Sequence, residues 1–244
     1  MTDRRVAVVT GGNKGLGKET ARQLAQRGMT VFVGARDPER GAMAARELKA
    51  DGVTVVAVPL DVTDADSVQA VAARLRADYG RLDVLVNNAG TVIACPVEDL
   101  TTVELRQTFE VNVFGAVTVV HAMLPLLKNS AAPRIVNVSS TTASLSLTSG
   151  GTDFGGDAGH RSAYSSSKAA LNMLTVHYAQ AFQRDSGLAH IKINSATPGY
   201  TATELTGYRG RTVADGARII VELAMLPDDG PTGGFFNDQG PVPW

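Results

Sequence analysis

The chain has 244 residues, of which 44% are hydrophobic and 19% are charged, and its formal net charge is −1. This composition is typical of a globular protein, and the balanced charge argues against nucleic acid or an anionic membrane as a partner. The single cysteine, Cys95, excludes an internal disulfide, and the N-terminal residues lack a signal-peptide pattern, so we expect a cytoplasmic protein.

Short apolar runs alternate with longer amphipathic segments along the chain. The runs predict strands at 6–9, 31–33, 53–58, 82–86, 134–138, 191–195 and near 234–236. Helices are predicted at 20–27, 39–50, from 64 onward, in two stretches across 97–127, and at 163–184 and 212–226. We therefore expect one α/β domain over residues 1–244, with a parallel sheet of about seven strands and helices on both faces.

The most apolar region of the chain is residues 111–127. Asn112, His121 and Pro125 interrupt it, and it is shorter than a bilayer requires. We expect no membrane span there.

A glycine-rich turn follows the first predicted strand, which ends at Thr10. Gly11 would permit the tight turn, Gly15 would let a pyrophosphate approach the backbone, and Gly17 would allow close packing of the next helix. Free N–H groups at that helix N-terminus favour phosphate binding. Taken alone, the glycines are equally consistent with a tight turn that binds nothing. Their position directly after the first strand indicates a dinucleotide site and a Rossmann-type, doubly wound sheet.

The same segment almost matches a phosphate-binding P-loop. Gly12, Gly17 and Lys18 have the required spacing, but Glu19 stands where a serine or threonine hydroxyl should bind magnesium. A nucleoside triphosphatase is therefore disfavoured.

Tyr164 and Lys168 are four residues apart in the predicted helix 163–184. Residues at this spacing lie on one face about one turn apart, so a lysine ammonium would lower the pKa of the phenol from its usual ~10. Such a tyrosine exchanges a proton with a substrate oxygen near neutral pH. The pair, together with the glycine-rich turn, indicates a redox enzyme.

These and further motifs occur in the order found in a known family. The chain resembles the short-chain dehydrogenase/reductases of the single-domain branch over nearly its whole length, and within them the NADPH-dependent carbonyl reductases. The matching residues are Thr10-Gly11-x-x-x-Gly15-x-Gly17, Asn87-Asn88-Ala89-Gly90, Asn112, Val138-Ser139-Ser140, Tyr164-x-x-x-Lys168 and Pro198-Gly199, with Asn13-Lys14-Gly15, Ala35-Arg36-Asp37-Pro38 and Gly234-Phe235-Phe236-Asn237-Asp238 marking the subgroup.

The resemblance implies catalytic roles for four residues. Tyr164 would be the general acid in carbonyl reduction, and Lys168 would tune it and hold the nicotinamide ribose. Ser140 would steady the substrate oxygen, and Asn112 would anchor a water relay to Lys168. Each residue alone has an ordinary structural explanation in packing, a strand end or a solvated helix face; their joint occurrence favours catalysis.

The end of the second strand argues for NADP(H). Enzymes of this fold that use NAD place an acidic residue there, but this chain has Ala35 followed by Arg36, whose guanidinium can bind a 2′-phosphate. Lys14 would be a second cation. A register slip by two would bring Asp37 to the ribose; we expect Asp37 to cap the helix beginning at Pro38 instead. NADP(H) is preferred and NAD is left open.

The resemblance also implies the remaining cofactor contacts, with Asp61 and Val62 beside the adenine. The full predicted set is Gly11, Asn13, Lys14, Gly15, Leu16, Gly17, Arg36, Asp61, Val62, Asn88, Ala89, Gly90, Tyr164, Lys168, Pro198, Gly199 and Thr201. The four histidines and Cys95 show no metal-ligand spacing, so no metal is expected.

The segment 141–163, between Ser140 and Tyr164, is longer than in the shortest family members and rich in glycine. It is either a flap over the substrate or a tolerated surface insertion. Monomeric carbonyl reductases carry a much longer insertion that blocks oligomerisation, so a homodimer or homotetramer is left open. The expected pocket residues, which suggest an apolar or aromatic carbonyl substrate, are Leu145, Phe154, Tyr200, Leu205 and Tyr208.

The resemblance thus implies an oxidoreductase that transfers hydride between NADP(H) and a small carbonyl or secondary alcohol. The first alternative is a 3-oxoacyl thioester reductase, which needs a site for a carrier protein or coenzyme A; only Arg209 and Arg211 suggest a basic patch. The second is a dinucleotide sensor without catalysis, which has no need to keep both Tyr164 and Lys168.

Overall fold

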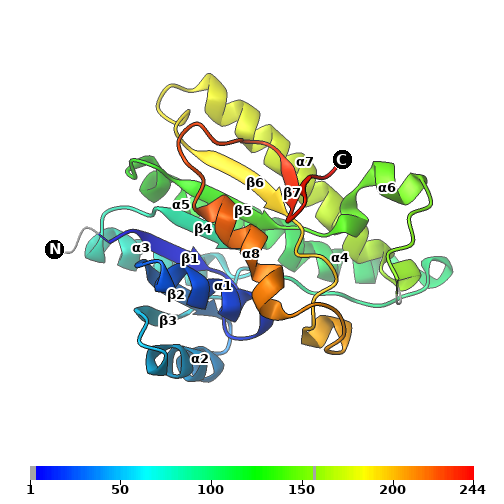
Figure 1. The fold of residues 1–244 in the computed structure, drawn as a ribbon, viewed down its shortest axis with the longest axis horizontal. Helices are drawn as coiled ribbons and strands as arrows, with labels where there is room; N and C mark the ends of the chain where they lie inside the picture. Colours follow the sequence, from blue (N-terminus) through cyan, green and yellow to red (C-terminus); the bar gives the residue numbers. More distant parts are fainter. Residues whose placement is uncertain (1–3, 156–157) are drawn as a thin grey trace.

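The structure is a computed structural model that describes residues 4–155 and 158–244. Within these residues one sheet runs in the order β3-β2-β1-β4-β5-β6-β7-β8, parallel throughout except for the antiparallel β7–β8 pair (Figure 1). The strands are β1 (Val6–Val9), β2 (Thr30–Ala35), β3 (Val55–Pro59), β4 (Val84–Asn87), β5 (Arg134–Val138), β6 (Lys192–Ala196), β7 (Phe235–Asn237) and β8 (Gly240–Pro241).

The doubly wound α/β architecture predicted from the sequence is confirmed, with one strand more than expected. The additional strand β8 has two residues and forms a hairpin with β7. A run that short, containing Pro241, has no hydrophobic pattern, so it could not be predicted from the sequence.

Helices cover both faces of the sheet. They are α1 (Gly15–Gln26), α2 (Pro38–Ala50), α3 (Ala65–Asp78), α4 (Thr102–Phe109), α5 (Ala116–Lys128), α6 (Leu145–Ser149), α7 (Ser162–Arg184) and α8 (Val213–Ala224). Short turns η1 (Val97–Asp99), η3 (Thr141–Ala143), η4 (Ala158–His160) and η5 (Glu204–Thr206) are 3₁₀-helical, and η2 (Glu110–Gly115) is π-helical. The short helix α6 lies in the segment for which the sequence predicted only a loop.

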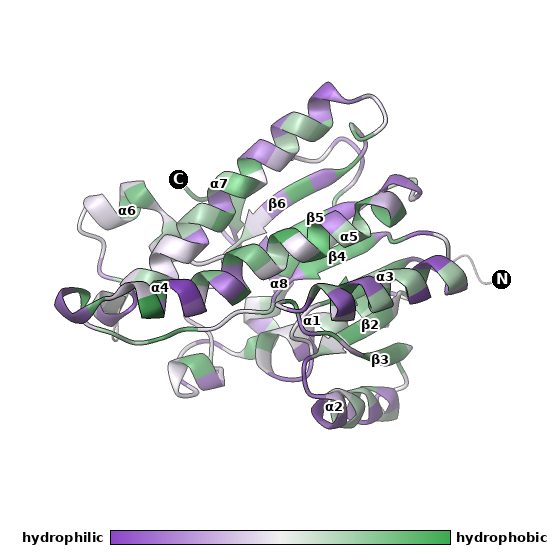
Figure 2. Ribbon diagram, turned by 180° about the vertical axis from the view of Figure 1, so that it is seen from behind, coloured by the Kyte–Doolittle hydropathy of each residue, from purple (hydrophilic) through white to green (hydrophobic). Residues whose placement is uncertain are grey.

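The core consists of two hydrophobic layers, one on each side of the sheet. Alternate residues of a strand enter opposite layers: Val8 packs with side chains of α3, α5 and α7, and Val9 packs with those of α1, α2 and α8. Figure 2 shows the hydrophobic colouring concentrated in the central strands β4 and β5. Burial on both faces explains why these strands are apolar throughout.

One helical run is longer than the sequence indicated. Residues Thr102–Lys128 form a continuous run of α4, η2 and α5, long and apolar enough to cross a membrane by length and composition alone. Half of its apolar window is buried inside the domain, and Met123 and Leu126 pack in the core layer with Leu85 of β4. This is the packing of a core helix.

The strand order reverses direction between β1 and β4, which are hydrogen-bonded neighbours. In sheets of this kind, ligands bind in the crevice beyond the carboxyl ends of the strands at that point. The segments that follow β1, β4, β5 and β6 therefore meet at one edge, and they contain the predicted site residues.

Candidate active site

The glycine-rich turn has the backbone conformation that its glycines predict. Gly11 and Gly15 have φ angles of 62° and 50°, in the left-handed region. A Cβ on Gly17 would lie 2.3 Å from Asn88 Nδ2 and 2.5 Å from the Gly11 carbonyl oxygen. Gly17 is thus needed for the close approach of α1 to the turn and to the segment after β4.

The N-terminus of α1 has no side-chain cap. Lys14 occupies the N-cap position without a capping hydrogen bond, whereas Asp37 and Asp64 accept backbone N–H bonds at the starts of α2 and α3. The first N–H groups of α1 are therefore left for another acceptor, and a phosphate is the acceptor this geometry favours.

Asn88 and Thr10 fasten the turn to the segment after β4. Asn88 Nδ2 donates to the carbonyl oxygens of Thr10 and Gly11 at 2.8 and 3.1 Å, and Thr10 Oγ1 accepts from the N–H groups of Asn88 and Ala89 at 3.0 and 2.9 Å. Asn88 was predicted as a cofactor contact. In the structure, its side chain is hydrogen-bonded to the glycine-rich turn and stabilises it.

Tyr164 and Lys168 lie one turn apart on α7, as their spacing predicted. Lys168 Nζ is 5.7 Å from the centroid of the Tyr164 ring and donates to the carbonyl oxygen of Val138 at 2.7 Å. Lys168 is buried and Tyr164 is half-buried, and burial lowers the pKa of Lys168 to about 8.

The expected lowering of the Tyr164 pKa is wrong for this structure. Burial raises the pKa of Tyr164, and this effect exceeds the opposing influences of a hydrogen bond from Ser140 and the charge of Arg161. The Lys168 ammonium is instead bonded to the Val138 carbonyl oxygen. The spacing of four residues could not reveal how strongly the phenol is desolvated.

Ser140 is brought to Tyr164 by the end of β5. Its side chain hydrogen-bonds with that of Tyr164, and its Oγ lies 3.0 Å from Thr142 Oγ1. Thr142 Oγ1 in turn accepts from Ser165 Oγ at 3.0 Å. Ser140 is therefore positioned from both sides, and Thr142 is a site residue that sequence reasoning missed because it matches no motif.

Asn112 lies in the π-helical turn η2 and is 1% exposed. Its Nδ2 donates to Ser167 Oγ at 2.9 Å and to the Thr91 carbonyl oxygen at 3.0 Å, and its Oδ1 accepts from Thr91 N–H at 2.8 Å. Ser167 Oγ donates to the carbonyl oxygen of Tyr164. Asn112 is thereby tied to α7 through Ser167, a link absent from the motif. Its suggested water relay stays a prediction.

Gly90 separates Asn112 from Lys168. A Cβ at this position would lie 3.3 Å from Asn112 Oδ1 and 3.5 Å from Lys168 Nζ. The two polar groups thus face the same small space beside Gly90, and any larger residue would intrude between them. Asn112, Ser140, Tyr164 and Lys168 all lie around this end of α7.

The segment after β2 matches the predicted alignment. Ala35 is the last residue of β2, Arg36 is exposed, and Asp37 Oδ1 accepts from the N–H groups of Glu39 and Arg40 at 3.0 and 3.1 Å. Asp37 also forms an ion pair with Arg40. The prediction that Asp37 caps α2 is confirmed, so its carboxylate is engaged with the helix.

The other predicted cofactor residues follow β3 and β6. Asp61 Oδ1 accepts from Thr63 N–H at 2.9 Å, and Val62 is 6% exposed. Gly199 has a φ of 70°, and Thr201 Oγ1 donates to the carbonyl oxygens of Pro198 and Gly199. These bonds stiffen the two segments that border the crevice.

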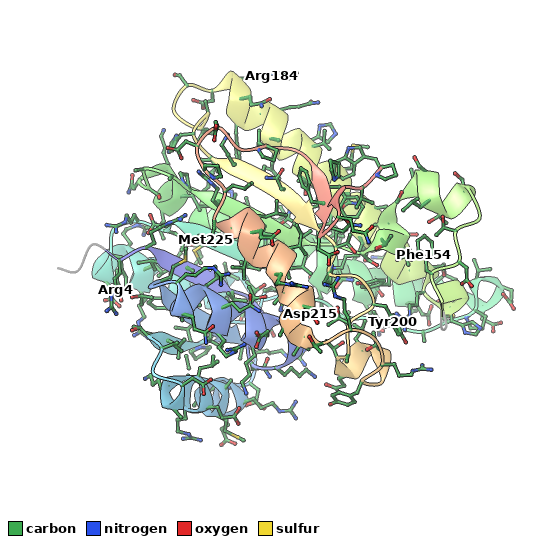
Figure 3. The ribbon with its side chains drawn as sticks, in the orientation of Figure 1. Arg4, Phe154, Arg184, Tyr200, Asp215 and Met225 are labelled. Carbon is green, nitrogen blue, oxygen red and sulfur yellow. The ribbon has the colours of Figure 1, made fainter. Side chains whose placement is uncertain are left out.

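The predicted pocket residues are unevenly enclosed. Phe154 is half-buried, while Leu145 and Tyr208 are 73% and 75% exposed, and Tyr200 and Leu205 are 36% and 42% exposed. Figure 3 labels Phe154 in the segment after α6 and Tyr200 in the loop after β6. The sequence predicted a flap or a surface insertion at 141–163; part of that segment lies outside the described residues.

No group of three or more potential metal ligands occurs within residues 4–155 and 158–244. Cys95 is half-buried, and burial and nearby acidic residues raise the pKa of its thiol. The backbone of Cys95 pairs with that of Arg161, and Cys95 N–H donates to the His160 carbonyl oxygen. Cys95 thus joins the loop after β4 to the start of α7.

Residues 5–214 match the model of the short chain dehydrogenase family. The chain belongs to the short-chain dehydrogenases. Salutaridine reductase from Papaver bracteatum is 33% identical, covering 97% of this chain and 95% of its own. Carbonyl reductase 1 (NADPH) from Bos taurus is 33% identical, covering 98% of both chains. An NADPH-bound carbonyl reductase from chicken fatty liver matches in structure over 100% of both chains, with a TM-score of 0.85 and 28% identity.

Proposed function

We propose that this short-chain dehydrogenase is an NADPH-dependent carbonyl reductase that converts an aldehyde or ketone to the alcohol, and catalyses the reverse reaction when alcohol and NADP⁺ are supplied. The observation that carries the proposal is the convergence of Ser140, Tyr164, Lys168 and Asn112 beside a glycine turn whose helix is uncapped. The names of the relatives, carbonyl reductases among them, support the same chemistry.

The residues present fit a dinucleotide. The positive φ angles of Gly11 and Gly15 and the uncapped N-terminus of α1 suit a pyrophosphate, and Arg36 with Lys14 suits a 2′-phosphate. Lys168 would hold the nicotinamide ribose hydroxyls. Bound NADPH would supply the hydride that adds to the carbonyl carbon.

Tyr164 supplies the proton that balances the reaction. As the hydride adds, the carbon–oxygen π bond breaks, and the substrate oxygen takes the proton from Tyr164 Oη, giving the alcohol. The raised pKa of Tyr164 keeps the phenol protonated before reaction, which is the form a proton donor needs. Ser140 stabilises the developing charge by hydrogen bonding, and Lys168 returns a proton to the tyrosine.

The proposal is tested by following the absorbance of the reduced nicotinamide while NADPH or NADH is mixed with aldehydes, ketones and diketones. We expect substrate-dependent oxidation, faster with NADPH than with NADH. Binding of both nucleotides without oxidation by any carbonyl compound would instead identify a dinucleotide sensor. Activity confined to 3-oxoacyl thioesters would assign the protein to that narrower class of reductase.

We also propose that the protein is cytoplasmic and self-associates as a homodimer or homotetramer. The exposed side chains of Val103, Phe114 and Met173 on α4, η2 and α7 are the observation that supports self-association. Light scattering of the purified protein tests it, and a monomer at micromolar concentration would contradict it.

A further inference from the structure

The loop after β6 lies against the glycine-rich turn. A Cβ on Gly15 would be 3.5 Å from Thr203 Cγ2, and one on Gly216 of α8 would be 2.6 Å from Thr201 Oγ1 and 3.3 Å from Leu16 Cδ1. The next residue, Glu204, begins η5 and forms an ion pair with Lys14 of the turn. This ion pair joins segments 190 residues apart in the sequence.

Glu204 also faces the start of α2. The charges of Lys14 and Arg40 both lower the pKa of its carboxyl group, so Glu204 is ionised at neutral pH. Arg40 lies in the first turn of α2, close after Arg36. Glu204 therefore places a negative charge at the corner formed by the glycine turn and the end of β2, where the 2′-phosphate of NADP(H) would lie under the proposed function.

A phosphate and a carboxylate compete for the same ammonium. Lys14 and Glu204 have side chains 58% and 64% exposed, so their attraction is weakened by solvent and the pair can separate at little cost. A bound 2′-phosphate would have to take the Lys14 ammonium from Glu204. This competition opposes NADP(H) and leaves NAD(H), which has no such phosphate, almost unaffected.

We propose that Glu204 is a specificity-determining residue that competes with the 2′-phosphate of the cofactor for Lys14 and so limits the preference for NADP(H). This inference rests on the proposed function, because it presumes that a dinucleotide occupies the crevice. The weakening is specific to the phosphorylated cofactor, and it fades at high salt as the charges are screened.

The test is equilibrium binding of NADPH and NADH to the wild-type protein and to Glu204→Gln, measured by calorimetry. We expect Glu204→Gln to bind NADPH about threefold more tightly at low salt and NADH unchanged. The gain should disappear in the background of Lys14→Gln and in about 1 M salt. Thermal unfolding of each variant verifies that it is folded.

Glu47→Gln is the matched control. Glu47 forms an ion pair with Lys18, one helical turn from Lys14, and its side chain is 57% exposed, close to that of Glu204. The Glu47→Gln substitution removes the same charge from the same side of the molecule without involving Lys14. The affinities for NADPH and NADH should therefore both stay unchanged.

Three results separate the possible failures. If Glu204→Gln changed the affinities for NADPH and NADH equally, or abolished both, competition with the 2′-phosphate would be refuted. Such a result would indicate that the Lys14–Glu204 ion pair covers the pyrophosphate, which both nucleotides have. If Glu47→Gln showed the same selective gain in NADPH affinity, the effect would come from the net charge of the protein, and the proposal would also be refuted. A wild-type protein that binds neither nucleotide would refute the proposed function, and this inference with it.

Discussion

The two sides of the crevice are built differently. On the cofactor side, Gly17 and Asn88 are in close contact, Asp37 caps α2, and Thr10 accepts two backbone bonds. On the proposed substrate side, Leu145 and Tyr208 are 73% and 75% exposed and bury little of their apolar surface.

The difference fits what each side would bind under the proposed function. A dinucleotide is the same in every turnover, so its site gains from being fixed in advance by short hydrogen bonds and close packing. The substrate surface carries exposed apolar side chains whose burial would come from the substrate itself. Changes that disturb the packing of the cofactor side should therefore cost stability, and changes on the substrate side should alter catalysis with little effect on stability.

The largest effect is expected at the boundary between the two sides, in Tyr164→Phe. The variant keeps the ring and loses the proton donor, so turnover should fall about 10³-fold. NADPH affinity should stay close to that of the wild type, because the phosphate contacts are elsewhere. Steady-state kinetics and calorimetric binding measure the two quantities; unchanged turnover would refute the assigned role.

Gly17→Ala and Gly159→Ala compare the two sides directly. A Cβ on Gly17 would lie 2.5 Å from the Gly11 carbonyl oxygen, whereas one on Gly159 would meet nothing within 4 Å. The first variant should lose roughly 1–3 kcal/mol of unfolding free energy, and the second should change it by less than about 0.5 kcal/mol. Urea unfolding measures both, and equal losses would contradict the comparison.

Buried Lys168 should make stability depend on pH. Its pKa is about 8 in the folded protein and 10.5 when unperturbed, so between these values the unfolded chain binds more protons. Stability from this group is therefore present above pH 10.5 and is lost as the pH falls through about 8.

The measurement compares the wild type with Lys168→Met between pH 8 and pH 10. The wild type should gain about 2 kcal/mol of unfolding free energy relative to the variant over this range. If the unfolding free energies of the two proteins changed with pH in parallel, the burial of Lys168 would not desolvate its ammonium group.

Arg36→Ala tests the cofactor side without disturbing its packing, because Arg36 is exposed. Loss of a guanidinium that binds the 2′-phosphate should raise the Michaelis constant for NADPH about tenfold and leave that for NADH nearly constant. Initial rates with each nucleotide are the measurement. Equal effects on the two nucleotides would exclude the phosphate contact.

A small effect on stability is expected on the proposed substrate side, in Tyr208→Gly. Tyr208 has a φ of 61°, which for a bulky residue costs roughly 1 kcal/mol, and glycine would relieve it. The variant should be as stable as the wild type or slightly more stable in urea. If Tyr208 contacts the substrate, the Michaelis constant for apolar carbonyl compounds should rise while that for NADPH stays constant.

Local features of the site could be predicted from neighbouring residues. The glycine turn, the cap at Asp37 and the placement of Tyr164 and Lys168 on one helix each depend on a few consecutive residues. The features that the sequence did not reveal are the π-helical turn around Asn112, the short helix α6, and the pairing of β7 with β8. None of these has a repeating hydrophobic pattern.

By itself, the sequence determined the α/β alternation, the position of the glycine-rich turn and the placement of Tyr164 and Lys168 on one helix, because strand burial and helix spacing follow from local residue patterns. Only the tertiary structure decided the direction of the Tyr164 pKa, the connection of Asn112 to α7 through Ser167, and the pairing of Lys14 with Glu204. Desolvation and contacts between distant segments arise only when the chain has packed, so no short stretch of residues encodes them.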